Sequence, residues 1–290
     1  MGYMHIENLY KNQTIQLFRR CYALEKIHGT SAHVSWKDGQ VHFHSGGEKY
    51  DNFVALFDVE ALKAKFEAMG HPEVIVFGEA YGGKQQAQSH RYGKQLKFIA
   101  FDVKVGDHWL DVPNAHQVSN RLGLEFVHYV EVDTDIESLN AQRDAPSEQA
   151  KRNGIVGDQM REGVVLRPLR EFRDTNGDRI ISKHKNDIER ETKTTRDASV
   201  DPAKLKVLAD AQAIADEWVT PTRLQHVLDK LPGVGIQDTP KVILAMIEDV
   251  VREGKGEIVD SKEARKAIGA LTAKLFKQHV KASLQASDPA

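Results

Sequence analysis

The sequence predicts an α+β protein, in which an antiparallel-sheet domain is followed by a small all-helical domain. Over residues 1–190, short runs rich in Val, Ile, Phe and Tyr are bounded by Gly, Asp and Asn, as in strands joined by turns. After residue 203 the apolar residues recur with helical spacing. We therefore place the first domain at residues 1–190, a linker at 191–203 and the helical domain at 204–290.

A hairpin and a helix can be placed in the first domain. Residues 32–36 and 40–44 flank a Lys-Asp-Gly sequence and predict a hairpin, because Asp-Gly suits a tight turn. Residues 59–69 have helical spacing and precede Gly70, which predicts that the helix ends there. Further strands are expected at 73–78, 96–105, 163–167 and 179–185.

The segment before the second domain is polar and short of apolar residues, as a linker is. Four amphipathic stretches follow it, at 204–218, 222–231, 239–252 and 261–284. Thr220 stands directly before Pro221, which is a helix start signal. The second domain is therefore expected to be helical throughout.

The composition is that of an ordinary globular protein, with 40% hydrophobic and 28% charged residues in 290. No apolar run approaches the roughly 20 residues that a membrane span needs, and the first residues do not resemble a signal peptide. Cys21, the single cysteine, excludes an intramolecular disulfide and a cysteine-based zinc finger. We expect a cytoplasmic protein with no membrane partner.

The net charge is −2, from 40 basic and 42 acidic residues, but the charge is not evenly distributed. Residues 151–196 carry 12 lysines and arginines against 8 acidic residues. A basic segment can bind nucleic acid even in a neutral protein, because affinity depends on local phosphate neutralisation. A solvated basic loop explains the same numbers, and charge alone does not decide between the two.

Lys26 begins the tetrapeptide Lys-Ile-His-Gly, just before the predicted hairpin. The pattern K-x-x-G occurs four times in the chain, so it gives little information by itself. A lysine at the start of a strand can be held in a sheet cleft, where desolvation and nearby cations favour the neutral, nucleophilic amine. The alternative is a surface lysine at a strand end.

Three later motifs place acidic and aromatic residues on the predicted strands: Phe-Gly-Glu at 77–79, Phe-Asp-Val at 101–103 and Glu-Gly-Val-Val-Leu-Arg at 162–167. Lys183 and Lys185 are two residues apart in a predicted strand, so they share one face. Two ammonium groups on one face repel each other unless an anion lies between them. Their spacing therefore indicates a phosphate.

In this order the motifs resemble those of the covalent nucleotidyltransferases, which comprise ATP-dependent ligases and capping enzymes. The likeness is closest to phage-type RNA ligase 2 and covers residues 25–185, where Glu-Lys-Ile-His-Gly-Thr is more specific than K-x-x-G. The resemblance implies an antiparallel-sheet nucleotidyltransferase domain of the ATP-grasp-like ligase type. The helical tail also resembles that RNA ligase, whereas DNA ligases and capping enzymes continue with a β-rich OB-fold.

The resemblance implies a role for each basic or acidic motif residue. Lys26 would be the nucleophile that takes AMP from ATP. Glu162 would aid Mg²⁺ or Mn²⁺, and Lys183, Lys185 and Arg167 would contact the phosphates. We group Lys26, Glu162, Lys183 and Lys185 as catalytic residues, with Glu162 as the metal ligand.

The resemblance also assigns the nucleotide-binding residues. Phe101 and Val165 would hold the adenine between them, which suits a base with two apolar faces. Glu79 would contact the ribose, Asp102 would order the site around the adenylate and metal, and His28 would lie near the transferred AMP. The full ATP- or AMP-binding set is Glu25, Ile27, His28, Glu79, Phe101, Asp102, Val165 and Arg167.

In the tail, Arg223, Asp249 and Glu253 match polar positions that the family uses after adenylation, so we expect them to serve the nucleic acid. Asp249 and Glu253 are four residues apart and share a helix face, and a solvated face is the alternative. One departure concerns His44, which precedes Ser-Gly where the family often has Arg. An imidazole cannot replace a bidentate guanidinium, so that contact would be weaker or supplied elsewhere.

Together these observations predict an ATP-dependent RNA ligase that joins 5′-phosphate and 3′-hydroxyl ends at nicks in duplex RNA or an RNA/DNA hybrid. The expected cofactors are ATP and Mg²⁺ or Mn²⁺, the expected partner is nicked duplex RNA, and the protein is expected to be a monomer. The alternatives are a small ATP-dependent DNA ligase and a non-catalytic RNA-binding relative of a ligase.

Overall fold

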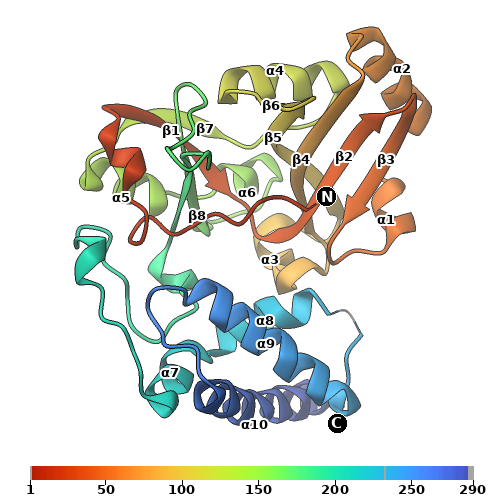
Figure 1. The fold of residues 1–290 in the computed structure, drawn as a ribbon. Helices are drawn as coiled ribbons and strands as arrows, with labels where there is room; N and C mark the ends of the chain where they lie inside the picture. The colour runs from red at the N-terminus through yellow and green to blue at the C-terminus, as the bar shows by residue number, and fades with distance from the viewer. Residues whose placement is uncertain (1, 232, 287–290) are drawn as a thin grey trace. The chain divides into compact units, whose positions relative to one another are not determined.

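Residues 2–231 and 233–286 are described by the computed structural model of the chain, which separates into two units, residues 1–186 and 187–290. The first unit contains two antiparallel sheets with helices around them, and the second unit is built from helices (Figure 1). The predicted α+β class, with antiparallel sheets followed by a helical region, is confirmed.

The first sheet has the strand order β7-β1-β8-β9, and each neighbouring pair is antiparallel. Its strands are β7 (Tyr129–Asp133), β1 (Arg20–Lys26), β8 (Gly163–Pro168) and β9 (Ser182–Lys185). The strand predicted at 179–185 is therefore shorter than expected. Its first part leaves the sheet because Arg179 forms an isolated bridge with Arg173.

The N-terminal segment extends this sheet at the β9 edge. The N–H of Lys183 donates to the Glu7 carbonyl (2.9 Å), and the N–H of Leu9 donates to the Lys183 carbonyl (2.8 Å). At its other end the segment reaches the second sheet, where the rings of Tyr3 and Phe77 lie 5.1 Å apart. Residues 2–9 thus cross from one sheet to the other (Figure 1).

The second sheet has the order β3-β2-β4-β5-β6 and is also antiparallel. Its strands are β2 (Gly29–Lys37), β3 (Gln40–Ser45), β4 (Glu73–Gly82), β5 (Leu96–Val105) and β6 (His108–Trp109). The predicted hairpin is confirmed, because Lys37 pairs with Gln40. Asp38 (φ 52°) and Gly39 (φ 73°) both take the left-handed conformation that such a two-residue turn needs.

Three helices pack on the second sheet: α1 (Tyr50–Val54), α2 (Val59–Met69) and α4 (Val112–Leu122). The bounds predicted for α2 are confirmed. Asp58 caps its start by accepting from the Ala61 N–H (3.0 Å), and Gly70 ends it at φ 69°. Buried Phe66 of α2 stacks on Trp36 of β2, with ring centroids 5.9 Å apart.

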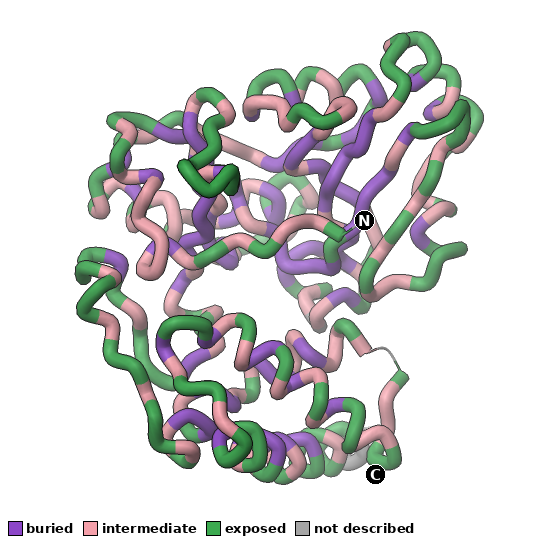
Figure 2. The backbone as a smooth tube through the Cα atoms, viewed as in Figure 1, coloured by how far each residue is buried: buried purple, intermediate pink, exposed green. Residues whose placement is uncertain are grey.

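The remaining helices of the first unit are short: α3 (Ser89–Tyr92), α5 (Ile136–Arg143), α6 (Glu148–Arg152), and the 3₁₀ turns η1 (Thr14–Leu17) and η2 (Gln85–Ala87). Figure 2 shows buried residues along the central strands of the two sheets, whereas the edge strand β3 has none. A polar side chain that is buried among these strands therefore needs a hydrogen-bond partner.

The second unit contains α7 (Ala211–Trp218), α8 (Pro221–Asp229), α9 (Thr239–Glu253) and α10 (Lys262–Ala286), with the 3₁₀ turns η3 (Asp187–Glu189), η4 (Pro202–Lys204) and η5 (Ile236–Asp238). The helix predicted at 204–218 begins later than expected. Leu208 instead exchanges backbone hydrogen bonds with Glu257 and Val259 (2.8 Å each). Its backbone groups are therefore unavailable to a helix.

The core of the second unit is separate from that of the first. Ile214, Trp218, Met246, Ile268 and Phe276 are each at most 1% exposed and belong to one apolar cluster. No helix within residues 2–231 and 233–286 combines the length and the apolar character needed to cross a membrane.

The segment expected to be a linker is attached to the helices of the second unit. Arg196 pairs with Glu217 (2.9 Å) and Glu257 (2.7 Å), and its guanidinium lies 5.7 Å from the Trp218 ring centroid. Lys193 donates its N–H to the Glu217 carbonyl (2.9 Å). Residues 191–203 therefore fold as part of the helical unit.

Asn186 ends the first unit and is fixed to it. Its N–H donates to the Glu162 carbonyl (2.8 Å), and its side-chain amide donates to Asp144 (3.0 Å). Glu191 forms an ion pair with Arg223 of α8 in the second unit. Only four residues of the chain therefore lie between Asn186 and Glu191.

Removing one arginine should release the attached segment. In Arg196→Ala the ion pairs to Glu217 and Glu257 are lost, so we expect amide hydrogen exchange over residues 193–197 to become about tenfold faster. Arg265→Ala is the matched control, because it breaks an exposed ion pair with Asp260. Equal exchange in both variants and the wild type, measured by mass spectrometry, would contradict the attachment.

Candidate active site

The pairing of three strands brings the predicted lysines together. Lys26 of β1 pairs with Gly163 of β8, which pairs with Lys185 of β9. Directly paired residues lie on the same side of a sheet, so both lysines face one side. Glu162 joins them: its Oε2 accepts from Lys26 Nζ at 2.8 Å, and its Oε1 lies 3.4 Å from Lys185 Nζ. The Glu162 side chain is only 3% exposed.

A second row on the same face is mostly apolar. We call the paired residues Lys26, Gly163 and Lys185 the lysine row. Two residues further along each strand, Leu24, Val165 and Lys183 are paired across β1, β8 and β9. Lys183 is buried, at 8% exposure. The predicted sharing of one face by Lys183 and Lys185 therefore holds, with Val165 beside them.

Two motif glycines are required by close packing. A Cβ on Gly29 would clash with the Ala80 carbonyl oxygen, and a Cβ on Gly163 would clash with the His184 carbonyl oxygen. Gly163 also has φ +151°, which side-chain-bearing residues rarely adopt. These contacts explain why the last residue of Lys-x-x-Gly and the second residue of Glu-Gly are glycines.

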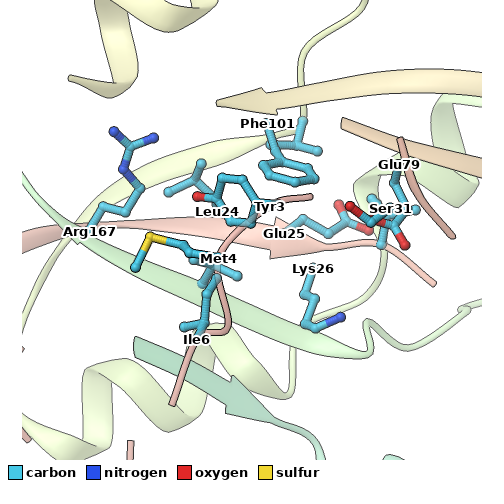
Figure 3. Close-up of a pocket in the computed structure, with 13 residues that line it drawn as sticks. Tyr3, Met4, Ile6, Leu24, Glu25, Lys26, Ser31, Glu79, Phe101 and Arg167 are labelled. Atoms are coloured by element: carbon cyan, nitrogen blue, oxygen red, sulfur yellow. The ribbon is translucent and has the colours of Figure 1, made fainter. Parts of the chain in front are cut away.

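A pocket of about 200 Å³ lies next to Lys26 (Figure 3). Phe101 of β5 and Val165 of β8 line it from different sheets, so two apolar side chains bound it from either side. The predicted site residues among its lining are Glu25, Lys26, Ile27, Glu79, Phe101, Val165 and Arg167.

A β-bulge places two consecutive residues on the pocket side of β5. Phe77 pairs with Asp102 and Gly78 pairs with Ala100, which leaves Phe101 as the extra residue. Consecutive strand residues normally point to opposite faces, and a bulge re-aims them. Phe101 can therefore line the pocket while Asp102 also reaches toward the first sheet.

Asp102 is fully buried, and its carboxylate accepts hydrogen bonds from two arginines and a tyrosine. Its Oδ1 accepts from Arg167 Nη1 (2.9 Å), and its Oδ2 accepts from Arg179 Nη1 (2.7 Å) and from the Tyr3 hydroxyl (2.7 Å). Glu171 bonds both arginines. Asp102 thus links the two sheets, and we call it, with its arginine and tyrosine partners, the Asp102 hub. Its role in ordering the adenylate and the metal stays a prediction.

Arg167 is likewise engaged within the protein. Its three nitrogens donate to Asp102, Glu171 and the Leu110 carbonyl, and the residue is 1% exposed. This arrangement pairs β8 with β5 through Arg167 and Asp102. The phosphate contact of Arg167 stays a prediction.

Glu25 directs its carboxylate away from the lysine row, as alternation along β1 requires. It accepts from the Ser147 hydroxyl (2.5 Å) and from the N–H groups of Glu148 (3.0 Å) and Gln149 (3.2 Å), at the start of α6. Burial raises the pKa of this carboxyl. Ile27, also predicted to bind nucleotide, is 4% exposed and lines the pocket.

His28 is held close to Glu162. Its Nδ1 lies 3.4 Å from Glu162 Oε2 and 3.2 Å from the Gln86 amide oxygen, and the residue is 1% exposed. Gln86 also donates to the Gly29 carbonyl, and its backbone takes the unusual φ of 48°. Strained residues of this kind concentrate at functional sites. Gln86 was not predicted, because a glutamine in a loop carries no sequence signal.

Glu79 pairs with Ser31 across β4 and β2, and both line the pocket. Burial raises the pKa of Glu79 to about 8, an effect that the charge of Glu162 reinforces and that of Lys26 opposes. Glu79 is therefore largely protonated at neutral pH and can donate a hydrogen bond. A protonated Glu79 is better suited to hydrogen-bond a neutral polar group of a ligand than to bind a cation.

His44 stacks on His33 across the β2–β3 pair, with ring centroids 5.0 Å apart and planes at 29°. His33 is 9% exposed, and burial together with His44 lowers its pKa to about 4. His44 is thus part of a stacked pair on the second sheet, and this position supplies no guanidinium.

The predicted residues of the tail take part in ion pairs within the second unit, and their role toward nucleic acid stays a prediction. Arg223 is 2% exposed and pairs with Asp249 (2.5 Å) and with Glu191 (3.2 Å), while His226 lies 2.9 Å from Glu191. Asp249 is 5% exposed. The solvated face considered for Asp249 is therefore wrong, and these charges anchor residue 191 to α8 and α9. Glu253 pairs with Arg252 (3.7 Å).

The acidic side chains alone do not form a complete metal site, so a bound metal would also need oxygen atoms from the nucleotide phosphates and from water. Within the described part of the chain, no group of three or more His, Cys, Asp or Glu side chains is arranged to hold an ion. Glu162 offers two carboxylate oxygens next to Lys26 and Lys185. Such a single carboxylate suits Mg²⁺ that is shared with phosphate oxygens and water.

Several pocket residues were missed by the sequence analysis: Tyr3, Met4, Ile6, Leu24, Ser31 and Val127. The strand residues could have been found from alternation, because Leu24 is two residues from Lys26 and therefore shares its face. No sequence signal locates the N-terminal residues, since their contacts are with distant strands.

Comparison with known proteins supports the fold. The sequence profile of the RNA ligase family matches residues 19–185. No curated protein matches the chain. The structure of Naegleria gruberi RNA ligase with PPi has a TM-score of 0.51 at 16% identity, over 65% of this chain and 56% of that chain.

A mutant of the same Naegleria gruberi protein with ATP and Mn has a TM-score of 0.52 at 14% identity, over 65% of this chain and 57% of that chain. The chain therefore covers little more than half the length of these proteins. At this identity the likeness concerns the fold.

Removing the shared carboxylate should destabilise the first unit. Asp102→Ala leaves Arg167 and Arg179 buried without that partner, and we expect a loss of about 3–5 kcal/mol in the free energy of unfolding. Asp107→Ala is the control, because Asp107 is fully exposed and pairs only with Lys104 at 3.4 Å. Urea unfolding measures both variants. An equally small loss in the free energy of unfolding of Asp102→Ala and Asp107→Ala would contradict the role of Asp102 as a hub.

The pKa of Glu79 predicts a pH dependence of stability. Because the folded-state pKa, about 8, lies above the unfolded value of 4.5, the folded protein binds the extra proton over this range. Wild type should therefore lose stability relative to Glu79→Gln as the pH rises from about 5 to 8. Denaturation midpoints of both proteins across this range measure the difference, and parallel pH profiles would contradict the shift.

Proposed function

This chain belongs to the RNA ligase family, and we propose that it is an ATP-dependent RNA ligase that carries AMP on Lys26. The observation that supports this most is the lysine row. Lys26 Nζ lies 2.8 Å from buried Glu162, beside a second lysine and an apolar pocket between two sheets. A nucleophilic amine, cations for phosphates and a slot for a base are the groups that nucleotide transfer needs.

The nucleotide is proposed to lie with its base between Phe101 and Val165. Both residues line the pocket from different sheets, and a base offers an apolar face to each of them. Protonated Glu79 and its neighbour Ser31 are positioned for the ribose hydroxyls. The phosphates would then extend toward Lys26 and Lys185.

The ion pairs around Glu162 suggest how Lys26 is activated. Glu162 holds both Lys26 and Lys185, and an ammonium held in this way is not a nucleophile. Phosphate groups would attract Lys185, and Glu162 together with those phosphates would hold Mg²⁺ or Mn²⁺. Released from its carboxylate, the Lys26 side chain is available to attack the α-phosphorus. The bound metal supplies positive charge for the departing pyrophosphate.

The reaction would proceed in three transfers. Lys26 Nζ bonds to the α-phosphorus of ATP as the bond to the pyrophosphate oxygen breaks. An oxygen of the RNA 5′-phosphate then takes the AMP and breaks the nitrogen–phosphorus bond. The RNA 3′-hydroxyl finally attacks the 5′-phosphorus and displaces AMP. In each transfer the protein positions groups and neutralises charge.

The proposed substrate is nicked duplex RNA or an RNA/DNA hybrid, and the proposed nucleotide and metal agree with the ligands of similar structures. Naegleria gruberi RNA ligase was solved with ATP and Mn and with AMP and Mn. We further propose that the protein acts as a monomer in the cytoplasm, in keeping with one buried, free thiol at Cys21.

Lys26→Ala should abolish covalent AMP transfer. Wild type incubated with ATP labelled at the α-phosphate and with Mg²⁺ should gain an acid-labile label on the protein, and Lys26→Ala should gain none. Lys266→Ala is a matched control, because Lys266 begins another K-x-x-G sequence and is exposed on helix α10. A label that persists in Lys26→Ala, or that never forms on wild type, would refute the mechanism.

Sealing assays distinguish the proposed substrate from its alternatives. All-RNA, all-DNA and mixed nicks are compared under the same conditions. The proposal expects the RNA and hybrid nicks to be sealed at least about tenfold faster than the DNA nick. Preference for the all-DNA nick would identify a DNA ligase instead, and tight RNA binding without any AMP transfer would identify a non-catalytic relative.

A further inference from the structure

The N-terminal segment supplies part of the pocket wall. Tyr3, Met4 and Ile6 line the pocket together with residues of both sheets. In Figure 3 the Tyr3 ring lies next to Phe101, on the inner side of the pocket. These residues precede position 19, where the family profile begins to match. The proposed base site therefore has a third wall that none of the motif residues provides.

The Tyr3 ring is fixed among aromatic side chains. Its centroid lies 4.9 Å from that of Phe101 at an interplanar angle of 78°, 5.1 Å from Phe77 and 5.7 Å from Trp109. Edge-to-face contacts at these distances are favourable. Tyr3 thus supports Phe101, one of the two side chains proposed to stack on the base.

The hydroxyl of Tyr3 is also committed. It donates to Asp102 Oδ2 at 2.7 Å and accepts from Arg179 Nη1 at 3.3 Å. Burial raises the pKa of Tyr3, so the hydroxyl keeps its proton and remains a donor. Because the hydroxyl is bonded to Asp102 and Arg179, the part of Tyr3 that lines the pocket is its apolar ring.

The segment is held at a second point as well. Its backbone exchanges hydrogen bonds with Lys183 at both Glu7 and Leu9. The wall formed by Tyr3 is therefore fixed at both ends, by the Asp102 hub and by β9. A fixed apolar wall excludes water from the part of the ligand that touches it.

We propose that Tyr3 is a specificity-determining residue of the base site, which favours adenine by presenting an apolar wall to the edge of the base. This inference rests on the proposed nucleotide-binding function of the pocket. At C2 guanine carries an amino group where adenine has only a hydrogen atom. An apolar wall at that edge of the base would leave the amino group of guanine without a hydrogen-bond partner, which is costly. The ring of Tyr3 therefore disfavours guanine, and it also orients Phe101 for stacking.

The test measures nucleotide binding directly, by calorimetry with ATP and with GTP. Tyr3→Ala should weaken ATP binding by about tenfold and reduce the ratio of ATP to GTP affinity, because water then reaches the base. Tyr3→Phe keeps the apolar ring, so it should bind ATP within about threefold of wild type and retain the preference. An unchanged affinity and an unchanged ATP-to-GTP ratio in Tyr3→Ala would overturn the inference.

Matched variants separate this effect from unfolding. Tyr50→Ala removes a tyrosine that is 61% exposed on α1, and it should bind ATP as wild type does. Tyr3→Leu keeps apolar bulk and should fall between Tyr3→Phe and Tyr3→Ala in its ATP-to-GTP ratio. A general loss of folding would lower both affinities equally and leave the ratio unchanged, which counts against the inference.

The same series distinguishes this inference from the proposed function. In the AMP-transfer assay, Tyr3→Ala should raise the KM for ATP by about tenfold while kcat stays within about twofold. If wild type binds ATP but forms no AMP adduct, the ligase mechanism fails and the binding ratio still tests Tyr3. If wild type transfers AMP and Tyr3→Ala has the same KM and ATP-to-GTP ratio, only the inference about Tyr3 fails.

Discussion

The ion pair between Asp102 and Arg167 is the interaction on which the site depends. Asp102 belongs to β5 in one sheet and Arg167 to β8 in the other, and both are almost fully buried. Phe101 immediately precedes Asp102, and Val165 is two residues before Arg167 on the same side of β8. The pair therefore sets the separation of the two side chains that bound the pocket. Two buried charges are tolerated only while they remain paired, so the distance between the sheets is fixed rather than adjustable.

The chemistry of the site arises from strand register more than from closeness in sequence. Lys26 and Lys185 are far apart in the chain, but both pair with Gly163, and the absence of a side chain at Gly163 lets the strands approach. A shift of one residue in either pairing would send a lysine to the opposite face. Asp102 also bonds Arg179 and Tyr3, so residue 179 and the N-terminal segment are both attached to β5. Fold and reactivity therefore have a common origin in the antiparallel pairing of β1, β8 and β9.

Local patterns in the sequence were sufficient for the elements with strong local signals. The hairpin around Asp38 and Gly39 and the helix ending at Gly70 depend on turn chemistry and capping, which a short window contains. The lysines two residues apart also follow from strand alternation. The burial of Asp102 was not predictable, because it results from a bulge at Phe101 and from arginines more than 60 residues away. The same holds for Asp249, whose spacing from Glu253 fits an exposed helix face. Its burial results from Arg223, which pairs with Asp249 and also with Glu191.

The attachment of residues 191–203 to the helices has a mechanical consequence. Asn186 is bonded to the first unit and Glu191 to the second, so residues 187–190 are the whole covalent joint between them. Four residues extend over at most about 14 Å. The joint follows Asn186, so along the chain it begins two residues after Lys185. The covalent path from the helical unit therefore enters the first unit at β9, the strand that carries Lys183 and Lys185.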